Sequence, residues 1–170
     1  MKSRVYLILF LLLIPVQGSL LAPLAAFGLR PDLGLAVVYA IGLLTGPREA
    51  LLVGTAVGLL LDIGSVSLIG FSGLTHGVVG FCAGLLGRRV LDVQSSSNVV
   101  FLALFSVAQY LLAAVFLDMT YGSFPVLSQF FRRMVPQALV TTAAGYFLLR
   151  YATRRPVLAW LRRRELEKDA

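Results

Sequence analysis

The chain has 170 residues, of which 58% are hydrophobic and 14% charged, and it carries a net charge of +7. A water-soluble domain of this length still exposes much of its surface, so its interior is too small for that amount of apolar side chain. The composition therefore excludes a soluble globular domain. It indicates a lipid-solvated chain in which each backbone amide is hydrogen-bonded within its own helix.

Six apolar runs predict an all-α integral membrane protein, a bundle of about six transmembrane helices. Each run approaches the ~20 residues that a spanning helix needs. The runs cover residues 5–27, 31–47, 49–68, 71–87, 98–117 and 133–152.

The first run has two interpretations. Lys2 and Arg4 precede an apolar stretch that ends near Gly18 and Ser19, as in a signal peptide with a small-residue cleavage site. The apolar character continues to Leu29, which is long enough to span a membrane. We favour a retained first helix, with a cleaved signal peptide as the alternative.

The second and third runs are separated by Pro47-Arg48-Glu49, which breaks the helix and places charge at the break. We interpret the two runs as short true spans. A re-entrant hairpin is the alternative, and it would leave Arg48 and Glu49 near the bilayer centre, where charge is costly.

At the start of the second run, Arg30-Pro31-Asp32 is typical of a helix N-terminus, with proline in the first turn and a carboxylate near the positive end of the helix dipole.

Asp62, near the end of the third run, has several interpretations: a mark of the water boundary, a cap for the segment containing Ser65 and Ser67, a partner contact, or half of a buried pair.

Glycines recur at helical spacing in the third and fourth runs. Spacings of three and four residues keep side chains on one helix face, and small residues on such a face let two helix backbones approach closely in lipid. We predict a helix-packing or partner interface at Gly54, Gly58, Gly73, Gly77, Gly80 and Gly84.

The fourth run opens with Gly70-Phe71-Ser72-Gly73, which resembles the serine motif of a rhomboid intramembrane protease. That chemistry needs a histidine on the sixth helix to accept the serine proton, and the sixth run has none. The only histidine, His76, is four residues along the same helix as Ser72. We therefore expect no catalytic residues and no enzyme activity.

The acidic residues, Cys82 and His76 are dispersed along the chain, without the spacing of a metal site. No glycine-rich phosphate loop with a lysine is present either. We therefore expect no metal and no cofactor.

Basic residues orient the bundle. With both termini in the cytoplasm, all 15 lysines and arginines fall on the cytoplasmic side except Arg30, Arg132 and Arg133, as the positive-inside rule requires. Arg132 and Arg133 are interpreted as interfacial anchors, or alternatively as contacts for an anionic substrate or partner.

We predict a transmembrane domain over residues 1–156 and a basic tail over 157–170 at the cytoplasmic interface. Because the basic residues lie at the edges of apolar runs, we expect contact with membrane lipid and none with nucleic acid.

Three segments carry a resemblance to a known family: Pro31-Asp32-Leu33, the stretch from Gly54 to Asp62, and Gly70-Phe71-Ser72-Gly73-Leu74. In these positions, notably Pro31, Asp32, Asp62 and Gly70, the chain resembles the bacterial rod shape-determining protein MreD.

The resemblance implies a non-enzymatic scaffold of the cell-wall elongation machinery (the elongasome) in the inner membrane, acting in cell shape and peptidoglycan synthesis. It implies MreC, RodA and its transpeptidase as partners, with MreB contacted indirectly. It also implies a fold similar to the substrate-binding component of energy-coupling-factor transporters.

The alternative function is the substrate-binding component of a small-molecule (vitamin) transporter. Such a protein needs a polar pocket at the outer face, built from the loops near 62–70 and 118–125. Those loops offer few polar groups: Ser65, Ser67, Thr120, Tyr121 and Ser123.

Overall fold

The computed structural model describes residues 31–63, 70–89, 95–122 and 130–153. Within these ranges the chain forms five α-helices and one π-helical turn, without strands. The helices are α3 (Leu33–Thr45), α4 (Pro47–Ile63), α5 (Phe71–Arg89), α6 (Ser97–Tyr121) and α8 (Val135–Thr153), and the π-helical turn η2 (Phe130–Met134) precedes α8. The prediction of an all-α bundle is confirmed. The predicted first span and the basic tail lie outside the described residues.

The corner between α3 and α4 consists of a single residue. Helix α3 starts at its N-cap Asp32, whose carboxylate accepts the backbone N–H of Leu35. It ends at Gly46, which adopts a φ of +92° that favours glycine, and Pro47 starts α4 immediately afterwards. The charged residues Arg48 and Glu49, expected to lie in the break, instead form the first turn of α4.

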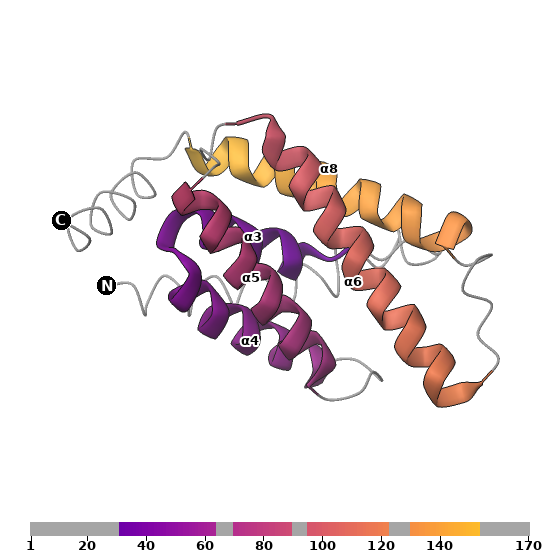
Figure 1. Cartoon of the computed structure of the whole chain (residues 1–170). Coiled ribbons are helices and arrows are strands. Elements are labelled where there is room, and N and C mark those ends of the chain that lie inside the picture. Colours follow the sequence, from indigo (N-terminus) through magenta and orange to yellow (C-terminus); the bar gives the residue numbers. More distant parts are fainter. Residues whose placement is uncertain (1–30, 64–69, 90–94, 123–129, 154–170) are drawn as a thin grey trace.

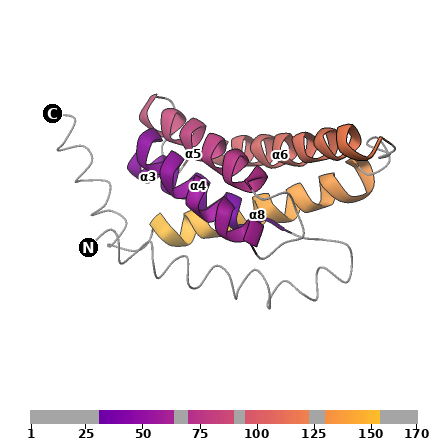
Figure 2. The ribbon, with the colours of Figure 1, turned by 90° about the horizontal axis from the view of Figure 1, so that it is seen from below.

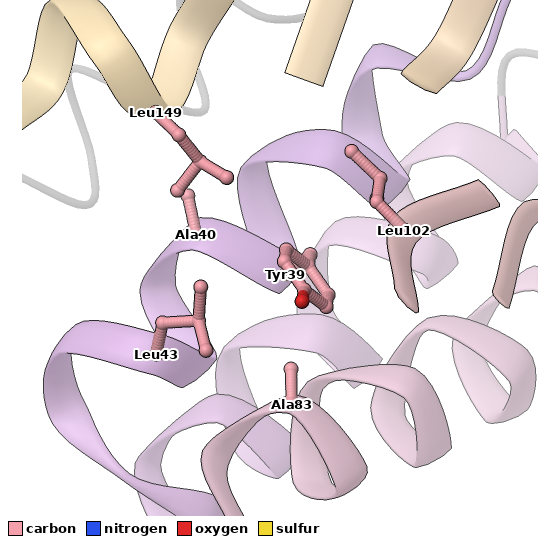
Figure 3. Close-up of a cluster of buried hydrophobic side chains, with 6 residues drawn as sticks. All are labelled: Tyr39, Ala40, Leu43, Ala83, Leu102 and Leu149. Carbon is pink, nitrogen blue, oxygen red and sulfur yellow. The ribbon is translucent and has the colours of Figure 1, made fainter. Parts of the chain in front are cut away.

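Helix α3 lies at the centre of the described bundle, between the α4–α5 pair and the α6–α8 pair (Figures 1 and 2). Every residue of α3 except Leu33 and Leu44 is buried. A helix that is covered on all sides has no need of a polar face, which explains its uniformly apolar sequence. Figure 3 shows one core cluster around it, in which Tyr39, Ala40 and Leu43 of α3 meet side chains from three other helices: Ala83, Leu102 and Leu149.

The six glycines singled out above all lie where α4 meets α5. A methyl group at Gly80 would come 2.6 Å from the carbonyl oxygen of Ala50, and one at Gly54 would come 2.5 Å from the carbonyl oxygen of His76. A methyl group at Gly58 would collide with the backbone of Ser72. The remaining three glycines face the same contact from α5: Gly73, Gly77 and Gly84. The glycine stripe is thus occupied by the chain's own helices.

The opposite face of α5 is apolar and exposed. Leu74, Val78, Phe81 and Leu85 follow one another at helical spacing and are not covered by the rest of the described chain. Helix α6 has a similar exposed face, and its segment Ser97–Phe116 is long and apolar enough to cross a membrane. Exposed large hydrophobic side chains on several helices fit a bundle surrounded by lipid.

Candidate functional site

Four helices bring polar side chains together around Asp32, at the end of the bundle where α3 and α5 begin. Gln109 of α6 donates its Nε2–H to Asp32 Oδ2 over 2.8 Å, and His76 of α5 places Nε2 3.2 Å from the same oxygen. The backbone N–H of Asp32 donates to Thr141 Oγ1 of α8 over 2.9 Å. We refer to Asp32, His76, Gln109 and Thr141 as the polar cluster.

The hydrogen bonds of His76 determine its charge. Its Nδ1 lies 2.8 Å from the carbonyl oxygen of Ser72, which can only accept, so Nδ1 carries a hydrogen. Its Nε2 faces Asp32, whose oxygens accept N–H groups from Leu35 and Gln109, and such donors stabilise the ionised carboxylate. His76 is thus an imidazolium that forms a buried ion pair with Asp32, and only 1% of its side chain is exposed.

Asp62 lies beside this pair. It is 1% exposed, and its Oδ2 accepts the backbone N–H of Gly70 over 2.7 Å at the start of α5. Its carboxylate also attracts the positive charge of His76. Asp62 therefore caps the chain entering α5 from a buried position. Ser65 and Ser67, named with it in one interpretation, lie outside the described residues.

Two buried polar atoms on α6 have no hydrogen-bond partner within the described part of the chain: Ser106 Oγ and Gln109 Oε1. Ser106 is fully buried. The two residues are three apart in a helix, so they lie on the same face. Unpaired buried polar atoms are uncommon and unfavourable in a folded protein, so these two atoms distinguish this face of α6 from the fully hydrogen-bonded part of the polar cluster.

The polar cluster was not predicted as a site. Sequence analysis identified Asp32 as a helix start, which it is, and considered His76 as a protease base or a metal ligand, while Gln109 and Thr141 were not singled out. A signal for them exists, because isolated polar residues within membrane helices usually face the bundle interior. The outer loops expected to form a vitamin pocket are mostly not described by the structure. Ser123 lies outside the described residues, and Thr120 and Tyr121 belong to the last turn of α6.

A serine protease is not supported by this geometry. His76 contacts the carbonyl oxygen of Ser72 with Nδ1 and uses Nε2 for Asp32, so no ring nitrogen is left to accept a proton from a serine hydroxyl.

No group of three or more metal-ligating residues occurs in the described ranges. Arg132 is exposed in the π-helical turn before α8.

The family of the chain is shown by its match to a family model. The model described as the ECF-type riboflavin transporter, S component, matches residues 13–153. The chain belongs to this family. No curated protein and no solved structure matches it. The match agrees with the all-helical membrane fold, and it makes the chain an integral membrane protein. Because the family consists of transporter components, the match supports the expectation of a non-enzymatic protein at the family level.

The resemblance to MreD is therefore wrong, and with it the cell-wall scaffold function and the partners MreC, RodA, its transpeptidase and MreB. The residues that suggested it serve the fold. Asp32 caps α3, Gly58 lets α4 and α5 touch, and Asp62 binds the backbone of Gly70. A short helical membrane bundle needs such positions whatever its function, so they do not identify a partner.

Proposed function

We propose that the chain is the substrate-binding subunit of an energy-coupling-factor transporter and that it binds riboflavin or a closely related small molecule. The observation that carries the proposal is the family match over residues 13–153. The polar cluster supports it, because ligand sites typically combine apolar walls with a small number of precisely placed polar groups. The partner in this proposal is the energising module of the same transporter.

The site in this proposal is the polar cluster together with the unpaired atoms of α6. Ion pairs and amides inside a lipid-solvated bundle are costly unless they are fully hydrogen-bonded, and those that are present often mark functional sites. Asp32 is well satisfied by its neighbours, whereas Ser106 Oγ and Gln109 Oε1 are not. A bound polar molecule would supply the missing partners.

Purified full-length protein in mild detergent is expected to bind riboflavin saturably, with a Kd below about 1 μM, which corresponds to about −8 kcal/mol. The measurement is the quenching of flavin fluorescence on titration with protein. Thiamine, an unrelated vitamin, serves as the control ligand in competition. A monodisperse, helical preparation that leaves flavin fluorescence unchanged would rule out riboflavin as the ligand.

We also propose that both termini are cytoplasmic, which places the polar cluster in the outer half of the membrane. Arg48 and Arg132 are both exposed. Arg48 lies in the first turn of α4 and Arg132 in the turn before α8, and these two helix starts lie at opposite ends of the bundle (Figure 1). In a Cys82→Ser background, Arg48→Cys is expected to react with a membrane-impermeant maleimide only after the cells are permeabilised. Arg132→Cys, the matched control, is expected to react in intact cells. The reverse labelling pattern would invert the orientation.

A further inference from the structure

Helix α6 presents its unpaired polar atoms beside residues that are already held in place. Ser106 is one turn from Leu102, which packs in the core against Tyr39 (Figure 3). Gln109 lies three residues further along and reaches Asp32 at the start of α3. The two unpaired atoms therefore lie on the side of α6 that faces α3.

The orientation of the Gln109 carboxamide is fixed by charge. A carboxylate has only acceptors, so the group that Gln109 turns toward Asp32 must be its NH₂. Rotating the amide by half a turn would place Oε1 against the carboxylate and create repulsion. As long as Asp32 is ionised, Oε1 must point elsewhere, and it meets no donor in the described chain.

Asp32 is held in place by several neighbours, so its carboxylate keeps its contact with Gln109. Its carboxylate contacts the N–H of Leu35 and the imidazolium of His76, and its own N–H is bonded to Thr141. Gly34 of α3 packs directly behind the pair: a methyl group there would lie 3.1 Å from Asp32 Oδ1 and 3.2 Å from His76 Nε2. The ion pair is thus a rigid support for the Gln109 amide.

We propose that Gln109 and Ser106 are the specificity-determining pair of the site, and that they recognise a neutral heterocycle through a lactam or imide edge. This inference rests on the proposed function. Gln109 Oε1 accepts the N–H of that edge, and the Ser106 hydroxyl donates to the adjacent carbonyl. Asp32 and His76 are positioning residues that keep the Gln109 oxygen turned toward the ligand.

Within the pair, Gln109 selects for the ring N–H, and Ser106 adds affinity through the neighbouring carbonyl. A ligand whose ring nitrogen is methylated leaves Gln109 Oε1 unpaired and adds a methyl group against it. Leaving a buried acceptor without a partner lowers affinity by about 10- to 100-fold. A ligand that is deprotonated at this ring nitrogen is also rejected. Its nitrogen would be an acceptor facing the acceptor Gln109 Oε1, and its negative charge would lie close to the Asp32 carboxylate.

The experiment compares riboflavin, whose ring carries an imide N–H, with N3-methylriboflavin, using the full-length protein in detergent. The native protein is expected to prefer riboflavin by about 10- to 100-fold. Gln109→Leu is expected to bring the two affinities to within about threefold of each other. Gln137→Leu, the same change on α8 outside the polar cluster, is expected to keep the native preference. Ser106→Ala is expected to weaken both ligands equally.

Asp32→Asn tests the positioning role. With its oxygen kept on the N–H of Leu35, the new amide turns an NH₂ toward Gln109, which must then rotate and turn its own NH₂ toward the ligand. The preference for the ring N–H is expected to disappear, although Gln109 is still present. Thermal melting of each variant shows whether the protein is folded.

The outcomes separate the two proposals. If the native protein binds riboflavin and its N3-methyl analogue equally well, or if Gln109→Leu keeps the native preference, the specificity pair is wrong while the transport function stands. If folded native protein binds neither flavin, riboflavin binding fails and the specificity pair fails with it. If Asp32→Asn keeps the preference while Gln109→Leu loses it, the positioning role of Asp32 is wrong.

Discussion

Gly58→Ala is expected to lower the free energy of unfolding by about 3 kcal/mol or to prevent folding, whereas Gly73→Ala is expected to change it by less than about 1 kcal/mol. At Gly58 the added methyl group would collide with the backbone of Ser72, which cannot move without separating α4 from α5. At Gly73 the nearest atom is Leu59 Cγ at 3.0 Å, in a flexible side chain, and the better helix propensity of alanine offsets the crowding.

The measurement for this pair is thermal unfolding in detergent micelles, followed by circular dichroism and by the fraction of protein that stays monodisperse. Both substitutions add one methyl group to a glycine of the α4–α5 contact, so they differ only in what the methyl meets. Equal loss of stability in the two variants would show that the contact depends on helix flexibility and not on the approach of the backbones.

The glycine contact also positions the candidate site. A methyl group at Gly54 would come 2.5 Å from the carbonyl oxygen of His76 and 2.9 Å from Val38 Cγ1 of α3. The close approach of α4 therefore fixes the position of α5 relative to α3. In this position the His76 ring contacts Asp32 and forms the ion pair of the polar cluster. Helix packing and the geometry of the polar cluster thus depend on the same small residues.

The helices could be predicted well from the sequence because their signals are local. The fourth predicted span, 71–87, corresponds to α5, and the fifth, 98–117, lies within α6. Asp32 was expected at a helix start and is the N-cap of α3. The third span was placed two residues late, because Pro47 was interpreted as a break although proline is well suited to the first turn of a helix.

The candidate site could not be predicted in the same way, because its residues are far apart in the chain. Asp32 and Thr141 are separated by 109 positions, and Asp32 and Gln109 by 77. No periodicity links such residues, and their meeting depends on how deeply each helix sits in the bundle. The incorrect assignment to MreD has a related cause, since caps and glycine contacts report the fold and not the ligand.

His76→Leu is expected to lower the free energy of unfolding by about 3 kcal/mol, because it leaves the Asp32 carboxylate buried without a counter-charge. Adding Asp32→Asn to this variant is expected to restore part of the loss. Both variants lack the bond from the imidazole to Ser72, so the comparison isolates the charge. The single variant is also expected to gain stability as the pH falls, since protonation of Asp32 removes the unpaired charge, whereas the double variant has no such carboxyl group. Unfolding in detergent at several pH values measures both effects, and a double variant no more stable than His76→Leu at neutral pH would contradict the ion pair.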